Sequence, residues 1–207
     1  MSSAQSIPQS RTRFTVAQYL ALERSAAQKH EYFDGEIVAM AGESPEHGLV
    51  SSNLVVTLGS QLIDKPCVVF TKDTKVRSGL GLVSNESANG IFSYPDLVFV
   101  CGEPEYFDEK RDVLLNPSAI IEVLSKSTEA YDRGEKFHRY QIWNPSLQDY
   151  LLVAQNKPQV EHYHREKDGK WSYQLYVGLA AVLLIPSIQC TLKLAEVYRK
   201  VTLIEEP

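Results

Sequence analysis

The sequence predicts a mixed α/β fold in which helices flank a mixed β-sheet. Three observations support this prediction. Segments with apolar residues at helical spacing alternate with strand-like segments along the chain. Two strand-like segments, residues 96–101 and 119–125, are so continuously apolar that we expect both of their faces to be covered. Segments 149–155, 159–166 and 171–177 then follow one another in the manner of an antiparallel run.

The length and composition fit one domain with short tails. The chain has 207 residues, of which 43% are hydrophobic and 23% charged, and this is enough to build a good core. We expect a flexible tail at 1–13, a single domain at 14–198 and a second tail at 199–207. The longest apolar run near the end, "LAAVLLIP", is far shorter than the roughly 20 residues of a membrane span, and the polar start lacks a signal core. We therefore expect a cytoplasmic protein with no membrane partner.

The net charge of −5 argues against a protein that holds nucleic acid by bulk electrostatics. A local basic groove remains open, and residues 71–77 and 132–139 are the candidate segments. From their charge pattern alone, these two segments are better explained as the solvated edges of a strand and a helix than as a basic groove.

The three cysteines are predicted to be buried thiols. Cys67, Cys101 and Cys190 are widely separated, odd in number and without CxxC spacing. Such spacing indicates neither a disulfide framework nor a zinc site.

The first half of the chain contains two helix signals and one hairpin signal. Val16, Tyr19 and Leu20 recur at helical spacing behind Thr15, a candidate N-cap. The segment "KHEYFDGEIVAM" is typical of a hairpin that turns at 34–35. A second helix is predicted to begin at "SPE", residues 44–46, which supplies a cap, a proline and an acid; its apolar face carries the leucines Leu54, Leu58 and Leu62.

The middle of the chain adds further strands, a loop and a helix. Strands are predicted at 67–71 and 74–77, and the Gly/Ser/Asn-rich stretch 78–90 is predicted to be a loop. Residues 131–143 are predicted to be helical, and the Asn-Pro pair at 144–145 ends that helix.

Two carboxylates stand in core-like strands. Asp96 lies at the entrance of the first apolar strand, and Glu122 lies inside the second, where an unpaired charge is costly to bury. Each acid can simply be paired internally, with Asp96 as a cap and Glu122 bound to a basic residue of the following helix (Arg133, Lys136 or Arg139). A pair of acids in adjacent strands instead favours a divalent cation, because a cation removes the repulsion between them.

A metal-dependent phosphodiester hydrolase needs such a cation and a nearby lysine. Lys136 is the best candidate, because it lies early in the helix that follows the Glu122 strand and can lean over the end of that strand. The alternative for Lys136 is a solvated helical pair with Asp132. Glu31 can be a third oxygen ligand or a charge at a strand edge.

Other chemistry is less well supported. A glycosidase with Asp96 and Glu122 as its carboxyl pair lacks an accompanying cluster of sugar-stacking aromatic residues. Serine chemistry at Ser125 or Ser127 lacks a GxSxG elbow. The histidines carry little signal, and they are placed as follows: His47 as a capping or surface residue, His162 and His164 on the exposed face of a strand, and His138 among helical charges.

Four segments together resemble the Uma-type putative restriction endonucleases, a family formerly catalogued as a domain of unknown function. The segments are "TVAQYLALERSAAQKHEYFDGEIVAMAGESPEHGLVSSNL", "YPDLVFVCG", "IIEVLSKSTEAYDRGEKFHRYQIWNPSLQDYLLV" and "IPSIQCTLKLAEVY". The resemblance covers residues 14 to about 198. The family is similar to PD-(D/E)XK nucleases, in which an aspartate and a Glu/Asp-X-Lys triplet bind magnesium around a mixed sheet. The resemblance therefore implies a restriction-endonuclease-like fold, with an additional C-terminal antiparallel strand region here.

The resemblance also assigns roles to residues. Asp96 matches the first acid and Glu122 the second, but the triplet ends in Leu124 instead of lysine. Either Lys136, in the "DRGEK" element, replaces that lysine, or hydrolysis is impaired. Glu31 resembles the N-terminal acid that some of these nucleases place near the metal.

The predicted function is that of a DNA endonuclease dependent on Mg²⁺, with Mn²⁺ as a substitute. The predicted metal ligands are Asp96, Glu122, the carbonyl of Val123 and Glu31, and the predicted catalytic residues are Asp96, Glu122 and Lys136. DNA is the expected partner. A homodimer is also expected, because many such nucleases cut two strands with two subunits and because apolar surface is expected on the C-terminal strands. The alternative is a non-catalytic nucleic-acid-binding or regulatory protein that retains the scaffold.

Overall fold

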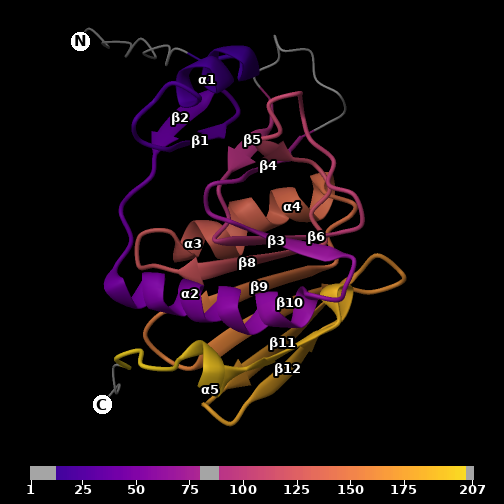
Figure 1. Ribbon diagram of the computed structural model, residues 1–207. Coiled ribbons are helices and arrows are strands. Elements are labelled where there is room, and N and C mark those ends of the chain that lie inside the picture. Colours follow the sequence, from indigo (N-terminus) through magenta and orange to yellow (C-terminus); the bar gives the residue numbers. More distant parts are fainter. Residues whose placement is uncertain (1–12, 80–88, 204–207) are drawn as a thin grey trace, which may run out of the picture.

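The computed structural model describes residues 13–79 and 89–203 (Figure 1). The helical segments are α1 (Val16–Glu23), α2 (Pro45–Gly59), η1 (Ser60–Leu62), α3 (Glu129–Tyr131), the π-helical turn η2 (Asp132–Lys136), α4 (Phe137–Trp143), η3 (Pro186–Ile188) and α5 (Leu194–Val197). The strands are β1 (His30–Phe33), β2 (Glu36–Ala39), β3 (Cys67–Thr71), β4 (Lys75–Ser78), β5 (Ile91–Ser93), β6 (Leu97–Cys101), β7 (Val113–Leu114), β8 (Ala119–Leu124), β9 (Asp149–Ala154), β10 (Gln159–Arg165), β11 (Trp171–Val177), β12 (Val182–Ile185) and β13 (Cys190–Lys193).

The central sheet has six strands in the order β11-β10-β9-β8-β6-β3. β8 and β9 are parallel, while the other neighbours are antiparallel, so the sheet is mixed as predicted. β6 and β8 lie inside this sheet, and every residue of β8 is buried. The continuous apolar runs therefore belong to central strands, because only a strand covered on both faces can bury all of its side chains.

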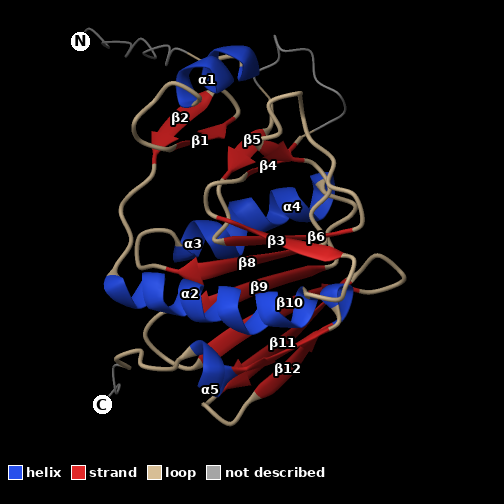
Figure 2. Ribbon diagram, in the orientation of Figure 1, coloured by secondary structure: helices blue, strands red, loops and turns tan. Residues whose placement is uncertain are grey.

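One face of the central sheet is covered by α2, which crosses it in Figure 2. Leu54 and Leu58 of α2 belong to one buried cluster with Ile121 and Val153 of the sheet. The expected helix cap is present, because the Ser44 hydroxyl accepts a hydrogen bond from a backbone amide in the first turn of α2. The helix thus begins where the sequence predicts.

The other face of the central sheet is covered by α4, which lies between this sheet and strands β4 and β5 (Figure 2). Phe137 and Tyr140 of α4 share a second buried cluster with Ile120 and Leu124 of β8. Since successive residues of a strand point to opposite faces, Glu122 points to the α4 face. The second face of the sheet is therefore the one that carries the predicted acid.

A five-stranded sheet, in the order β2-β1-β5-β4-β7, lies above α4 with α1 packed on it. α1 has a capping box. The side chain of Thr15 accepts a hydrogen bond from the backbone amide of Gln18, and the side chain of Gln18 accepts one from the backbone amide of Thr15. The predicted hairpin is confirmed: Asp34 and Gly35 join β1 to β2 with φ values of 45° and 95°. Positive φ at both positions is typical of a type I′ turn.

The fold class is confirmed, but the division into three sheets was not predicted. The antiparallel run expected at 149–177 is β9, β10 and β11. β12 and β13, which were not predicted, form a separate two-stranded sheet beside α2. β5 and β7 have three and two residues, which is too short for a periodic signal in the sequence.

The prediction that all three cysteines are thiols is wrong for two of them. Cys67 and Cys101 form a disulfide across 34 positions of sequence. They are paired directly across β3 and β6, and this pairing is invisible in their spacing along the chain. Cys190 is a buried free thiol, as predicted.

Several sequence predictions fall on residues that the structure does not describe. These are most of the expected tail at 1–13, the end of the expected tail at 199–207 and most of the loop at 78–90. Among the described residues, none of the helices has the length and apolar character needed to cross a membrane.

Candidate active site

Asp96 is held against β8, the strand that carries Glu122. It directly precedes β6, and its Oδ2 accepts a hydrogen bond of 2.7 Å from the backbone amide of Val123. The same oxygen lies 3.3 Å from Nε2 of His47, in the first turn of α2. Burial lowers the pKa of His47, but the hydrogen bond and the charge of Asp96, together with Glu43, outweigh burial and raise that pKa.

Glu122 is a buried acid next to the anchor of Asp96. Only 4% of its surface is exposed, and burial raises its pKa well above the usual range. The charges of Asp132 and Asp96 raise it further, and Lys136 opposes them. Glu122 Oε1 lies 2.8 Å from Lys136 Nζ, in a buried ion pair.

Lys136 is enclosed by three carboxylates. It is 4% exposed, and its Nζ lies 2.8 Å from Glu122, 3.5 Å from Asp132 and 3.6 Å from Glu31. Burial by itself lowers the pKa of Lys136, but the charges of Glu122 and Glu31 outweigh that effect and raise it well above its usual range. The ammonium therefore stays charged in the folded protein.

The π-helical turn η2 accounts for the position of Lys136. Asp132 and Lys136, the first and last residues of the turn, are both buried. Arg133, between them, instead pairs with Glu129 and Glu161. Such turns are rare and frequently occur at functional sites. The alternative of a solvated Lys136–Asp132 pair is therefore excluded, although the pair itself exists as part of a buried group.

Glu31 enters the same group from the five-stranded sheet. Its Oε1 accepts a hydrogen bond of 3.0 Å from the backbone amide of Tyr94, two residues before Asp96. The site is thus assembled from α2, β1, the start of β6, β8 and η2.

Sequence reasoning missed two members of this group. His47 was placed as a capping or surface histidine, but it is buried and contacts Asp96. Asp132 was considered only as a partner of Lys136 on a solvated helix. For His47 the sequence contains no sufficient signal, because only packing brings the start of α2 next to the residue that precedes β6.

The type of the donor atoms suits a hard divalent cation, but among the described residues the oxygens of Asp96, Glu122 and Glu31 do not lie within 4.8 Å of one another as one group. Asp96, Glu122 and Glu31 supply carboxylate oxygens, which Mg²⁺ and Mn²⁺ prefer. Burial is the main cause of the raised pKa of Glu122, and repulsion from the charges of Asp132 and Asp96 adds to it. A cation beside these acids would relieve that repulsion.

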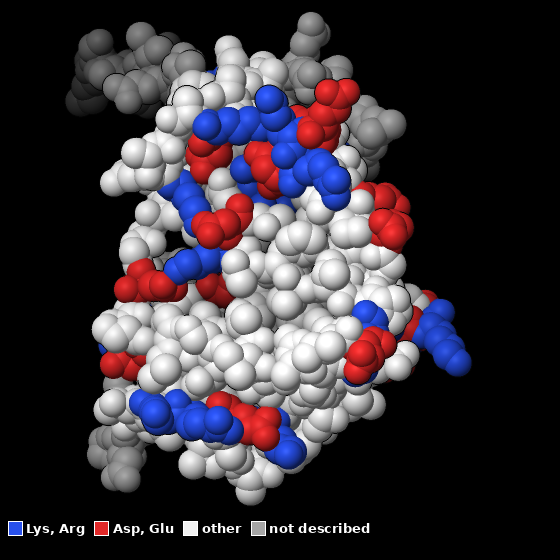
Figure 3. Space-filling view, in the orientation of Figure 1, with Lys and Arg blue, Asp and Glu red and all other residues white. Residues whose placement is uncertain are grey.

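A groove of about 610 Å³ lies at the ends of β8 and β9. Its lining carries charges of both signs, from Lys126, Arg133 and Lys157 and from Glu46 and Glu129. By contrast, the basic segment at 71–77 forms no free groove, because Lys72 pairs with Glu43 and Lys75 with Asp112. Figure 3 shows that charges of both signs gather on the upper part of one face, whereas the area over α2 carries few.

Comparisons with known proteins point to one family. Residues 16–195 match the model of a family, Uma2, described as "Putative restriction endonuclease". An uncharacterized protein of Synechocystis sp., slr1290, is 38% identical over 155 residues, which are 74% of this chain and 75% of the relative. A second, sll1609, is 36% identical over 157 residues, which are 76% of this chain and 84% of the relative.

A solved structure shares the fold. The crystal structure of a putative nuclease belonging to DUF820 from Anabaena variabilis superposes with a TM-score of 0.70 at 16% sequence identity. The likeness covers 89% of this chain and 97% of that one.

Proposed function

This chain belongs to the putative restriction endonuclease family, and from that premise we propose that it is a metal-dependent DNA endonuclease that hydrolyses phosphodiester bonds. One observation carries the proposal. Lys136 is buried among the carboxylates of Glu122, Glu31 and Asp132, beside the point where Asp96 meets β8. A charged group enclosed in this way is costly to bury and is typical of functional sites.

The proposed ligands of Mg²⁺ are Asp96, Glu122, the carbonyl of Val123 and Glu31, and Mn²⁺ is the expected substitute. When bound, such a cation polarises the scissile phosphate and lowers the pKa of an attacking water. His47 holds the carboxylate of Asp96 in place through its contact with Oδ2.

Lys136 supplies positive charge beside the acids. Its ammonium can stabilise the charge that develops on the phosphate, or hold the attacking water. Position 124, where the triplet would have a lysine, is a leucine. Lys136, the last residue of η2, lies next to Glu122 and takes the place of that lysine in the proposal.

DNA is the proposed substrate. The groove beside β8 offers Lys126 and Lys157, and backbone phosphates are bound mainly by lysine and arginine. The net charge of −5 confines such contacts to a local surface, so we expect binding to weaken steeply as salt is raised.

The test is plasmid nicking by pure protein with Mg²⁺ or Mn²⁺. We expect nicking by the wild type, its loss with a chelator, and its loss in Asp96→Ala and Glu122→Ala. Asp168→Asn is the matched control, because Asp168 is an acid in an exposed turn, where it pairs with Lys170. Equal nicking by the wild type and both alanine variants would identify a contaminant and contradict the proposal.

A second candidate follows from the missing lysine of the triplet. The chain can instead be a non-catalytic nucleic-acid-binding or regulatory protein on a nuclease scaffold. Salt-dependent DNA binding without nicking in any divalent metal would favour this candidate over the endonuclease.

A further inference from the structure

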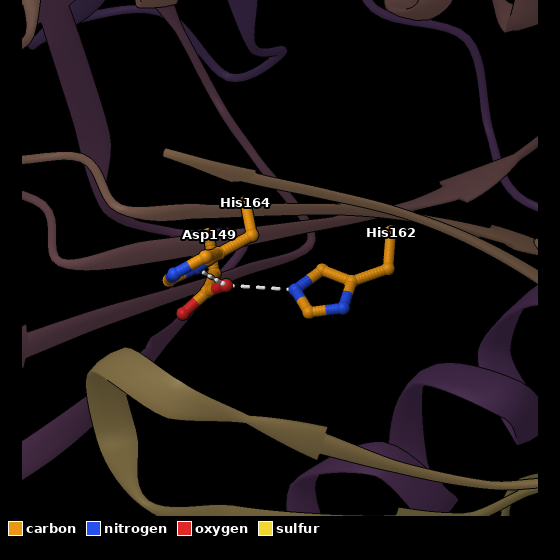
Figure 4. Close-up of side chains that lie close together, drawn as sticks. All are labelled: Asp149, His162 and His164. Atoms are coloured by element: carbon orange, nitrogen blue, oxygen red, sulfur yellow. Dashed lines mark hydrogen bonds and ion pairs between the residues drawn. The ribbon is translucent and has the colours of Figure 1, made fainter. Parts of the chain in front are cut away.

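A second cluster of metal-binding side chains lies on the other face of the central sheet. It consists of Asp149, the first residue of β9, with His162 and His164 of β10. The histidines occupy alternate positions and therefore share one face. His164 is paired with Asp149 across the two strands, so the register of the sheet brings all three together (Figure 4).

The cluster is buried and tightly connected. Asp149 is 0% exposed, and its Oδ1 lies 2.7 Å from Nε2 of His162 and 2.7 Å from Nδ1 of His164. Its Oδ2 accepts a hydrogen bond of 2.8 Å from the backbone amide of Ser187, in η3. The sequence had placed both histidines on an exposed face, and this is wrong for the buried His162 and for His164, whose side chain is 28% exposed.

We propose that Asp149, His162 and His164 form a binding site for one zinc ion. Two imidazoles and one carboxylate are a donor set that zinc favours, whereas Mg²⁺ prefers oxygen alone. All three donor atoms lie within 4.8 Å of one another. The Ser187 amide donates a hydrogen bond to Oδ2 of Asp149, the carboxylate oxygen that does not face the histidines. Hydrogen bonds of this kind commonly orient the carboxylate ligands of metal ions.

The geometry requires a small adjustment. Donors about 2.0 to 2.1 Å from a tetrahedral zinc ion are roughly 3.3 Å apart, so each ring must move back from the carboxylate by about half an ångström. His164 is the ligand with room to move, since part of its side chain reaches solvent. The same exposed side is where an ion can enter.

This site is separate from the nuclease site. Glu122 points to the α4 face, whereas Asp149 shares its face with Leu151 and Val153 in the cluster under α2. Asp149 is paired with Ala119, three residues before Glu122 on β8. A zinc ion here would link β9 and β10 and, through the amide of Ser187, η3.

The rival explanation is a metal-free cluster. In that case each neutral imidazole donates one N–H to Oδ1, and every oxygen of Asp149 is satisfied. The two explanations differ in whether the protein binds zinc with these histidines.

The experiment is calorimetric titration of Zn²⁺ into untagged, chelator-treated full-length protein with excess Mg²⁺ present. We expect one zinc per chain with micromolar or tighter affinity, and a rise in melting temperature with zinc concentration. His164→Gln should weaken binding by more than the roughly 10- to 100-fold typical of removing an outer partner. His138→Gln, which changes an exposed histidine of α4, should bind zinc like the wild type.

A readout on the wild type covers the case in which the His164 variant does not fold. The chain has five histidines, and ¹⁵N spectra of their rings should show two that shift on zinc addition. Shifts confined to His30 or His47, no saturable binding up to about 100 μM, or equal affinity in wild type and a folded His164→Gln would each overturn the site.

Discussion

Lys136 is the residue on which the proposed chemistry depends most. Replacing it with methionine keeps the bulk of the side chain but removes the charge among Glu122, Glu31 and Asp132. We expect Lys136→Met to lower the cleavage rate by about 10²-fold or more, the scale for loss of one charge-stabilising donor. The rate is measured on plasmid, and circular dichroism checks folding.

An arginine variant separates the possible roles of this ammonium. Guanidinium keeps the charge but is planar and does not release a proton. Substantial cleavage by Lys136→Arg would favour charge stabilisation, and complete loss would favour geometry or proton handling. Lys170→Met, at an exposed pair with Asp168, is the control. Wild-type rates in both Lys136 variants would remove this lysine from the mechanism.

His47 is expected to act through Asp96. His47→Ala removes the side chain that contacts Oδ2 at 3.3 Å, while the Val123 amide still holds the same oxygen. We expect the Mg²⁺ concentration needed for half-maximal cleavage to rise by about 10- to 100-fold, as for other outer partners of metal ligands. A variant that lowers the maximal rate at saturating Mg²⁺ but leaves that concentration unchanged would contradict a positioning role.

At the scale of elements, Asp112 joins α1 to β4. It binds Arg24 at 2.6 Å and Lys75 at 3.0 Å. Burial raises the pKa of Asp112, but hydrogen bonds from Arg24 and Lys75 outweigh burial and lower it to about 2. An unfolded aspartate has a pKa of about 3.9, so the stabilisation is complete above that pH and is lost as pH falls through about 2.

Asp112→Asn should therefore destabilise the protein at pH 7 by about 1 to 3 kcal/mol, and the difference from wild type should shrink between about pH 4 and pH 2. Urea unfolding of both proteins across this range measures it. A difference that is constant with pH would show that the carboxylate charge does not matter.

The disulfide fixes β3, an edge strand of the central sheet, to β6. It closes a loop across 34 positions of sequence, for which chain entropy predicts a stabilisation of roughly 3 to 4 kcal/mol. Unfolding by urea with and without reductant should differ by about this amount. The Cys67→Ser/Cys101→Ser double variant should unfold as the reduced wild type does and should not respond to reductant.

At the scale of the whole molecule, β11 leaves an apolar surface at the edge of the central sheet. Tyr173, Leu175 and Val177 are 54%, 45% and 63% exposed, and β10 is the neighbour of β11 on one side only. An exposed apolar edge strand favours association with another chain. We therefore propose a homodimer through this strand.

Light scattering at tens of micromolar should give twice the monomer mass. Leu175→Arg should return the mass to that of a monomer, because the charge would be buried at the interface. Val56→Arg, at an α2 position that is 69% exposed, should leave the dimer intact. A monomeric wild-type protein would contradict the proposal.

The sequence alone determined the elements with strong local signals. The cap at Ser44, the hairpin turn at Asp34 and the two central strands follow from short-range chemistry, so they could be predicted. Asp96 and Glu122 were also identifiable, because a carboxylate in an apolar strand conflicts with its surroundings. Their chemical role came from the family resemblance.

The tertiary structure decided everything that depends on register and packing. The π-helical turn sets Lys136 against Glu122, and the pairing of β3 with β6 turns two distant cysteines into a disulfide. The same holds for the histidines of β10: alternation cannot tell which face of a strand is covered. That face became buried because β12, β13 and η3 pack over it, and only long-range contacts determine such packing.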